Sequence, residues 1–188
     1  MRVGTPIWDL PSLIDVADAI VIASALEDKS SWEEGRIVTH SRVRIDRAIA
    51  GHLGNEPLWI RTKGGTIGSI CQFVDGEAVL QKTWPSLLFL VRVPNGSSSS
   101  GFEIAGGAHG QFPIVLGEHD EPRAIPSPWL CVLNPIADEL KLDPFASVTL
   151  DKISRDLSKS WARAHASSDP GGAAPKTAPA KGEPSRSG

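Results

Sequence analysis

The feature that most constrains the fold is a strict two-residue alternation along residues 36–46. Positions 37, 39, 41, 43 and 45 carry Ile, Thr, Ser, Val and Ile, whereas the alternate positions from 38 to 46 carry Val, His, Arg, Arg and Asp. Successive side chains of a strand point to opposite faces. This period therefore indicates a half-buried strand with one solvated face.

Further short strands are expected along the first two thirds of the chain, separated by turn signals. They cover residues 19–26, 58–62, 86–93, 102–104 and 112–116, with weaker candidates at 70–74 and 78–80. We expect residues 27–35, which are rich in charge, to form the loop after the first strand. Residues 86–93 are nearly continuously apolar, which places them at the centre of the core. Short strands without intervening helices favour an antiparallel barrel or sandwich and argue against a parallel α/β fold.

Two helices are expected outside the strand region. A short one covers residues 11–17 behind Pro11, which suits a first helical position. The second begins after Ser147 or Thr149 as its cap, and its apolar residues recur at offsets of three and four: Leu150, Ile153, Leu157 and Trp161. This stripe predicts an amphipathic helix of about four turns that packs against the barrel. Binding of a partner or of a membrane surface is the alternative.

The domain organisation follows from these segments. We expect a β-barrel domain over residues 1–116, a proline-rich irregular wrap over 117–148, the amphipathic helix over 149–166 and a disordered tail over 167–188. A length of 188 residues suits one domain with a self-sufficient core. The tail contains no large aliphatic residue and cannot bury apolar surface.

Charge and hydropathy narrow the classes of partner. The net charge of −3 comes from interspersed charges of both signs, so no broad basic face is available and nucleic acid is not expected as a partner. No stretch approaches the ~20 apolar residues of a membrane span, so we expect a soluble chain. Residues 1–8 do not read as a signal peptide. A leader upstream of Met1 would make the protein extracytoplasmic, and the sequence leaves both its compartment and its oligomeric state open.

The chain contains two cysteines, Cys71 and Cys131. Their spacing does not match a zinc motif, and we favour two free buried thiols. A disulfide between them is the alternative. It would close a loop of about 60 residues and stabilise the fold by roughly 4 kcal/mol in the chain-entropy model.

The glycine-rich segment from Gly64 to Ser69, which includes Gly65 and Gly68, follows a predicted strand. Such a segment can cradle a phosphate when a helix begins directly after it. Here the next residues read as another strand. A tight turn that requires positive φ angles is therefore the favoured interpretation.

Candidate catalytic groups are sparse. His109, His119 and Asp120 could supply a nitrogen and oxygen metal site, which would make the protein a metal-dependent hydrolase. They fall in predicted loops without helical metal-site spacing, so a solvated charged turn is favoured and we expect neither metal nor cofactor. Cys71 has no partner base apparent in the sequence, and the chain lacks a nucleophile elbow.

Three of the six tryptophans, Trp32, Trp59 and Trp84, lie at or near the ends of predicted strands. An indole in such a place can anchor a protein partner when it is exposed. Packing into the core at the ends of the barrel is the interpretation that we favour.

One whole-domain pattern resembles a known family. The pattern is the order of predicted strands and turns, which runs from Ala17–Ala23 through 36–51 and Leu58–Gly65 to Leu87–Leu90 and Phe102–Phe112. It is similar to the barrel of the netrin-like modules and tissue inhibitors of metalloproteinases, and to uncharacterised bacterial proteins with the same layout. The resemblance covers about residues 15–116 and implies a five-stranded OB-type Greek-key barrel with a binding role.

The sequence departs from this family where the family's function resides. Those inhibitors chelate the protease zinc through an N-terminal cysteine and contain many disulfides, whereas this chain has no cysteine before Cys71. No functional residue is therefore carried over.

The expected function is that of a non-enzymatic binding or structural module for a protein partner, such as an extracytoplasmic protease. The residues expected to bind are Trp32, Gly64, Gly65, Gly68 and His109. By analogy with other OB-type barrels, oligosaccharide or single-stranded nucleic acid is a further candidate ligand, although the nucleic-acid version lacks a basic groove.

Overall fold

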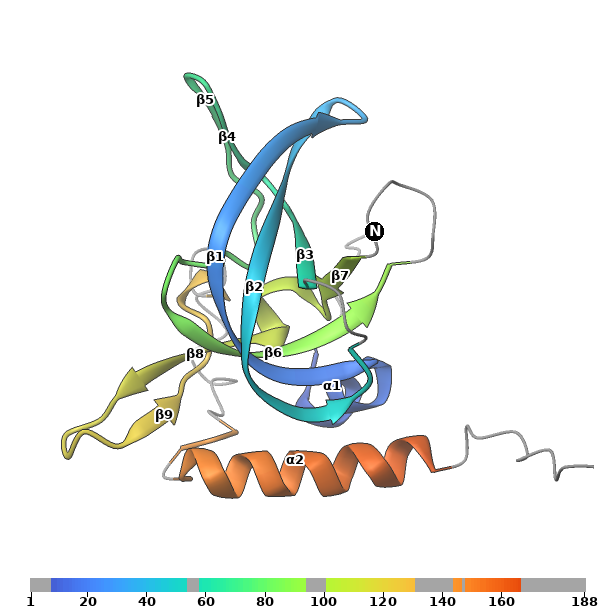
Figure 1. Ribbon diagram of the computed structural model, residues 1–188, viewed down its shortest axis with the longest axis vertical. Coiled ribbons are helices and arrows are strands. Elements are labelled where there is room, and N and C mark those ends of the chain that lie inside the picture. Colours follow the sequence, from blue (N-terminus) through green and yellow to red (C-terminus); the bar gives the residue numbers. More distant parts are fainter. Residues whose placement is uncertain (1–7, 54–57, 94–100, 131–143, 147, 167–188) are drawn as a thin grey trace, which may run out of the picture.

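The computed structural model describes residues 8–53, 58–93, 101–130, 144–146 and 148–166. Strands dominate it, with one helix before them and one after them, as predicted (Figure 1). The elements are α1 (Leu10–Val16), β1 (Ala19–Glu33), β2 (Arg36–Gly51), β3 (Leu58–Lys63), β4 (Gly65–Ile67), β5 (Ile70–Gln72), β6 (Pro85–Arg92), β7 (Gly101–Ile104), the 3-10 helix η1 (Gly107–Gly110), β8 (Gln111–Leu116), β9 (Pro122–Ala124), the 3-10 helix η2 (Pro128–Leu130) and α2 (Leu150–His165).

Five strands close into a barrel in the order β1-β2-β3-β7-β6, and β6 pairs back with β1. The contact between β3 and β7 is parallel, whereas the other four are antiparallel. This closed barrel confirms the predicted mainly β fold and is compatible with an OB-type barrel. Closure removes the free edges that an open sheet of these strands would expose.

The β1–β2 hairpin is much longer than expected. Residues 27–33 continue β1 as a strand, so the predicted loop over 27–35 is wrong and only Glu34 and Gly35 make the turn. Both have positive φ, 48° and 79°, which is the requirement of a two-residue hairpin turn. Charged residues remain in the strand because they pair across it, as Glu27 does with Arg42 at 3.2 Å.

The core lies on both faces of β1 and β6. Along β1, Val21 and Ala23 point into the barrel, whereas Ile20 and Ile22 point into a second cluster between the barrel and the helices. In β6, residues 87–90 are fully buried. A strand covered on both faces is apolar at every position, which is why residues 86–93 read as continuous in the sequence. Their central place in the core is confirmed.

The two helices cover the lower end of the barrel (Figure 1). Asp9 caps α1, and its side chain accepts a hydrogen bond from the N–H of Ser12. In α2 the residues of the predicted stripe are turned toward the core: Ile153 and Leu157 are buried, while Leu150 and Trp161 pack against the same cluster. Packing against the barrel is therefore confirmed. In the described part of the chain no helix is long and apolar enough to cross a membrane.

The segment after the barrel is more regular than expected. Residues 117–148 were predicted to form an irregular wrap, but β9 pairs with β8 in a hairpin that projects sideways. The three residues of β9 continue the sheet beyond β6 and β8. Residues 131–143 and 147 of this segment, and the predicted disordered tail over 167–188, lie outside the described residues.

Candidate functional site

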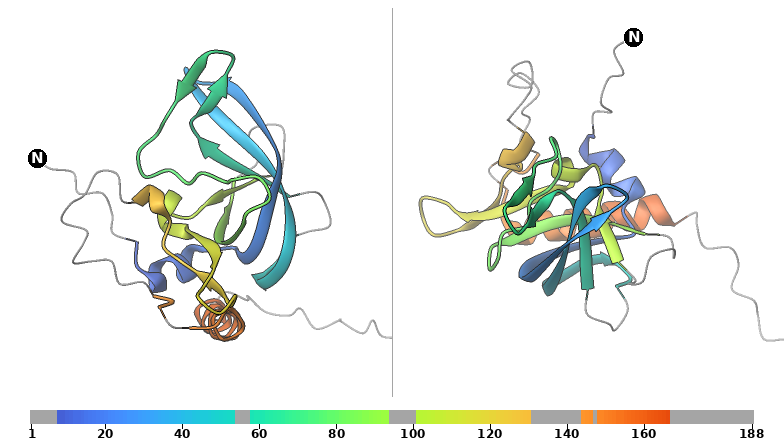
Figure 2. Two further views of the ribbon diagram at one scale, coloured as in Figure 1. Left: turned by 90° about the vertical axis from the view of Figure 1, so that its left-hand side faces the viewer. Right: turned by 90° about the horizontal axis from the view of Figure 1, so that it is seen from above.

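The β1–β2 hairpin extends well beyond the closed barrel. β6 pairs with β1 only over residues 19–24, whereas β1 continues to Glu33, and β3 accompanies β2 as far as Lys63. The β4–β5 hairpin lies beside this extension, and the next residues, 73–80, return toward the barrel (Figure 2). We call residues 27–42 and 61–80 the projecting end. The weak strand predicted at 70–74 corresponds to β5, while residues 78–80 form no strand.

Two glycines allow the hairpins of the projecting end to approach each other closely. The hydroxyl of Thr39 donates to the carbonyl of Gly64 at 2.7 Å and lies 2.9 Å from the hydroxyl of Ser30. A Cβ atom at Gly65 would lie 2.2 Å from the Thr39 hydroxyl oxygen, so a larger residue would force the neighbouring side chains to move. The side-chain carbonyl of Gln72 accepts a hydrogen bond from the N–H of Ile37 and ties the hairpins together once more.

The predicted turn over Gly64–Ser69 is confirmed in its backbone angles but not in its extent. Gly64, Gly65 and Gly68 all have positive φ, at 93°, 136° and 59°. Only Gly68 and Ser69 form the turn, however, because Gly65 belongs to β4, which pairs with β5. Gly64 and Gly65 thus have a packing role, whereas a Cβ atom added at Gly68 would meet no other part of the protein within 4 Å.

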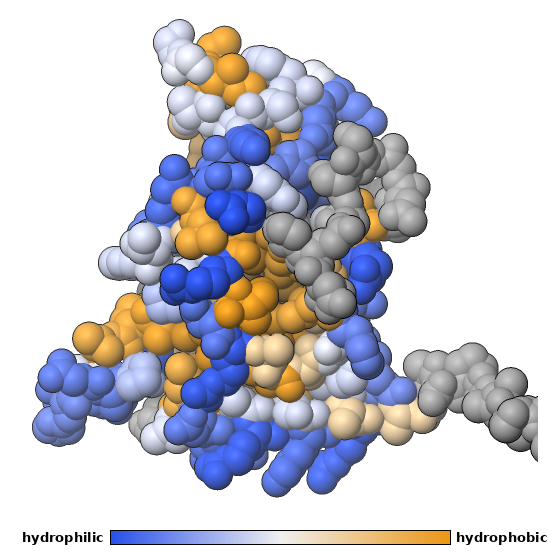
Figure 3. Space-filling view, in the orientation of Figure 1, coloured by the Kyte–Doolittle hydropathy of each residue, from blue (hydrophilic) through white to orange (hydrophobic). Residues whose placement is uncertain are grey.

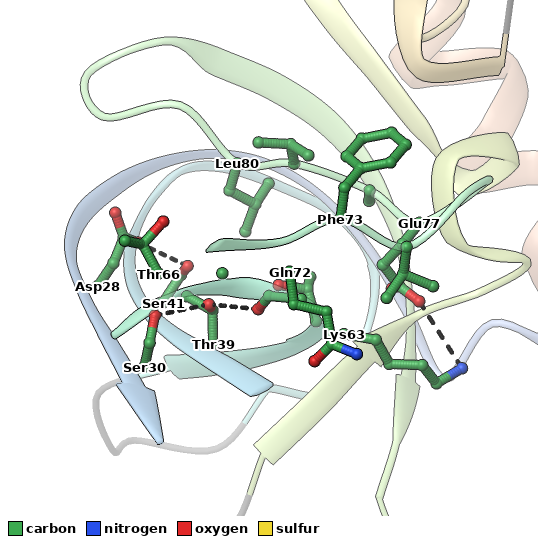
Figure 4. Close-up of a pocket in the computed structure, with 16 residues that line it drawn as sticks. Asp28, Ser30, Thr39, Ser41, Lys63, Thr66, Gln72, Phe73, Glu77 and Leu80 are labelled. Carbon is green, nitrogen blue, oxygen red and sulfur yellow. Dashed lines mark hydrogen bonds and ion pairs between the residues drawn. The ribbon is translucent and has the colours of Figure 1, made fainter. Parts of the chain in front are cut away.

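The projecting end forms a polar, half-open cavity of about 410 Å³. Side chains from β1, β2 and β3 line one wall. Figure 4 shows Asp28, Ser30 and Ser41 there, and Thr62 lines the same cavity. The opposite wall is made by residues 73–80 and includes the apolar side chain of Leu80. The polar wall is ordered by internal hydrogen bonds, such as the one that the Ser41 hydroxyl donates to Asp28 at 2.6 Å.

One carboxylate at the margin of the cavity has a perturbed titration. Burial raises the pKa of Glu77 above its ordinary value of 4.5, because the charged form loses hydration. The ammonium of Lys63, 3.7 Å away, opposes this shift in the pKa without cancelling it. Figure 4 shows this pair on the side of the cavity away from Asp28.

The projecting end also carries exposed apolar side chains. Trp32, Ile70 and Phe73 are 54%, 53% and 54% exposed. Figure 3 shows apolar atoms at the top of the molecule, where Figure 1 places the β4–β5 hairpin. The favoured packing of the tryptophans into the core is therefore wrong for Trp32 and for Trp84, which is also largely exposed. Trp59 is half-buried, beneath the ammonium of Lys29 at 5.0 Å.

The structure brings four of the five predicted binding residues together, namely Trp32, Gly64, Gly65 and Gly68, all on the projecting end. His109 does not join them. It lies in η1, which contacts β6, β7, β8 and η2, and burial lowers its pKa below the ordinary value of 6.5.

The three residues of the hydrolase alternative do not form a metal site. His119 and Asp120 lie in the turn between β8 and β9, where Glu121 accepts a hydrogen bond from the backbone N–H of His119 at 2.9 Å. Across the described ranges, no group of three or more His, Cys, Asp and Glu side chains could hold a metal ion. His109, His119 and Asp120 are therefore not assembled into one.

Cys71 is exposed on β5, so the expectation that both thiols are buried is wrong for this residue. The predicted alternative of a disulfide involves Cys131, which lies outside the described residues.

A charged network on the outside of the barrel was not anticipated from the sequence. Arg61 of β3 contacts Glu33 at 2.9 Å and Glu103 at 2.6 Å, and His40 lies 3.6 Å from Glu33. These residues come from four strands that the barrel places side by side, so only the strand order could have revealed them. Within this network, the charged side chains of the outer face pair with one another.

No protein-family model matches the chain, and none of the curated proteins matches it.

Proposed function

We propose that this chain is a non-enzymatic protein-binding module that contacts its partner through the projecting end. The observation that carries the proposal is the concentration of exposed apolar side chains there. Of the eight large hydrophobic side chains that are exposed in the described residues, the projecting end contributes Trp32, Ile70, Phe73 and Val79. Aromatic residues in such places supply a large contact area and dominate the energy of many interfaces.

The construction of the projecting end supports the same proposal. The Ser30, Thr39 and Gly64 hydrogen bonds hold the two hairpins together before any partner binds. A surface that is already ordered loses little conformational entropy on association, which favours affinity. The exposed side chains therefore lie on hairpins that are already ordered before a partner binds.

Inhibition of a protease is the narrower form of this proposal. It is supported by the barrel layout, which resembles that of the netrin-like modules, and by the exposed end that could enter a partner's cleft. The zinc-chelating mechanism of the metalloproteinase inhibitors is not part of it, because residues 1–70 contain no cysteine that could serve as the chelating residue.

Affinity capture with the full chain tests the proposal. Wild type and the Trp32→Ser variant are used to recover partners from the source cells, and the recovered protein is identified by mass spectrometry. The affinity of the purified partner is then measured for both chains. Removing a central aromatic anchor should weaken binding by roughly 30-fold or more, since such residues contribute about 2 kcal/mol or more.

Trp84→Ser is the matched control, because Trp84 is 56% exposed but lies beside the start of β6 rather than on the projecting end. This variant should bind as the wild type does. Equal losses in both variants, or no loss with Trp32→Ser, would contradict the proposal. Thermal melts of the three chains would show that the substitutions leave the fold intact.

A further inference from the structure

We propose that the cavity in the projecting end is a binding site for a small neutral polyol, of the size of a mono- or disaccharide. The site lies between the hairpins and includes neither Trp32 nor Ile70, although it shares Phe73 and Val79 with the proposed protein-binding surface. It is also on the inner side of the strands, opposite the outer face with the Arg61 network. Its volume of about 410 Å³ falls within the range of about 300–1,000 Å³ that is typical of ligand pockets.

The inward face of the strands changes its chemistry where the cavity begins. In the closed barrel the inward positions carry apolar residues such as Ala23, Val43 and Ile60. Further along the same strands they carry Ser30, Ser41, Thr62 and other residues with hydroxyl groups. Burying hydroxyls costs free energy unless they find hydrogen-bond partners. A row of them facing a cavity therefore suits a ligand that supplies such partners.

Some of these polar groups are already engaged and others are not. The Ser41 hydroxyl donates to one oxygen of Asp28, while the other oxygen of Asp28 has, within the part of the chain that the structure describes, only the ammonium of Lys82 near it, at 4.0 Å. Among the described residues, the hydroxyls of Thr62 and Thr66 have no hydrogen-bond partner. The cavity thus offers a fixed carboxylate acceptor and two uncommitted hydroxyls, which can each donate and accept.

The opposite wall suits the carbon face of the same kind of molecule. Val74, Ala78, Val79 and Leu80 face the cavity from the segment that crosses it. A sugar ring carries hydroxyls around its edge and C–H groups on its faces, so it can satisfy a polar wall and an apolar wall at once. A purely apolar ligand would leave the Asp28 side without partners.

The charges around the cavity favour a neutral ligand. The two carboxylates that line it, Asp28 and Glu77, have cations near them, Lys82 at 4.0 Å and Lys63 at 3.7 Å. The charges balance, which leaves no excess to attract a phosphate or a polyamine. A direct comparison of binding between neutral sugars and the charged ions phosphate and spermidine therefore tests this preference.

Nuclear magnetic resonance of the isotope-labelled full chain tests the proposal. The probes are glucose, galactose, mannose, N-acetylglucosamine, maltose and cellobiose, with inorganic phosphate and spermidine as charged comparators. At least one neutral probe should shift backbone amide signals of residues 28–30, 39–41 and 62–66 in a saturable way. Phosphate and spermidine should leave them unchanged at equal concentration.

Two variants link this binding to the cavity. Thr66→Val keeps the shape of the side chain and removes a hydroxyl that makes no bond within the protein, so it should weaken binding by about tenfold without unfolding the chain. Asp28→Asn should weaken it as well. Glu27→Gln is the control, because Glu27 pairs with Arg42 on the outside of the same strand, and it should bind as the wild type does.

Three results would overturn the proposal. In the first, no neutral probe produces saturable shifts, or the shifts fall outside the cavity. In the second, a charged comparator binds the cavity as well as the neutral probes do. In the third, the Thr66→Val variant binds with wild-type affinity.

Discussion

At the scale of single residues, Gly65 shows how closely the two hairpins approach each other. Its φ of 136° is unfavourable for other residues, and a Cβ atom would overlap the hydroxyl oxygens of Thr39 and Ser30 at 2.2 and 2.7 Å. We expect Gly65→Ala to lower the free energy of unfolding by roughly 2–4 kcal/mol, from backbone strain and overpacking together. Urea denaturation followed by tryptophan fluorescence measures this.

Gly68→Ala separates the two causes. Gly68 also has a positive φ, 59°, but nothing lies within 4 Å of the added atom. Its substitution should therefore cost only about 1 kcal/mol, the backbone part alone. If Gly65→Ala were no more destabilising than Gly68→Ala, the close approach of the hairpins would be refuted.

Glu77 predicts a pH dependence of stability. Burial raises the pKa of Glu77 in the folded state above its unfolded value of 4.5. At a pH between the unfolded and the folded pKa, the folded chain therefore binds more protons than the unfolded chain. The contribution of Glu77 to stability is therefore present at low pH and is lost as the pH rises through this window. Glu77→Gln should gain stability relative to wild type between pH 4 and pH 7, as measured by unfolding at several pH values.

Glu121 provides a control of opposite sign. Hydrogen bonds from its own backbone N–H and from that of His119 lower its pKa below the ordinary value of 4.5. Glu121→Gln should therefore lose stability relative to wild type as the pH rises through the range below 4.5, a lower range than that of Glu77, because the folded-state carboxyl ionises before the unfolded one. A Glu77→Gln variant that follows the direction of Glu121→Gln would contradict the burial of Glu77.

The residue scale also shows what the sequence could not predict. The positive φ angles of Gly64, Gly65 and Gly68 were foreseen because glycine in a turn signals them. That Gly65 faces Thr39 was not, since this contact joins residues 26 positions apart. The exposure of Trp32 was missed for a similar reason: an indole at a strand end is buried or exposed according to what lies over it, which a single strand does not reveal.

At the scale of elements, α2 is predicted to be part of the folding core. Leu157 is only 3% exposed and lies in the cluster that joins α2 to the barrel. Leu157→Ala should reduce the free energy of unfolding by about 2–5 kcal/mol, through lost burial and the cavity left behind. Lys159→Ala, on the exposed face two residues away, should change it by less than about 0.5 kcal/mol. Similar melting temperatures for both variants would show that the helix does not contribute to the core.

Element lengths were less predictable than element types. The sequence signalled the end of β1 at residue 26, where apolar residues give way to charged ones. The strand continues to Glu33 because its charges find partners on β2, as Glu27 does in Arg42, and a bulge at Leu26 resets which residues point inward. Pairing between strands, rather than local hydropathy, decided where this element ends.

At the scale of the whole molecule, the closed barrel and the projecting end should differ in stability. Residues 19–24 of β1 are paired with both β2 and β6, whereas residues 27–33 are paired with β2 alone. The second group also lacks the apolar contacts of the first. Hydrogen exchange should therefore be at least about tenfold faster at residues 28–32 than at residues 20–24. Equal protection along β1 would show that the chain opens as one unit.

By itself, the sequence determined the strands, the two helices and the apolar face of each. These features depend on hydrophobic periods of two and of about 3.6 residues, which a single segment of the chain contains. From the order of those segments came the expectation of a closed barrel. Only the tertiary structure decided how far the β1–β2 hairpin extends past the barrel, which hydroxyls face one cavity and which charges pair across four strands. Those features arise from contacts between residues distant in the chain, and strand register, which sets such contacts, is not contained in any one segment.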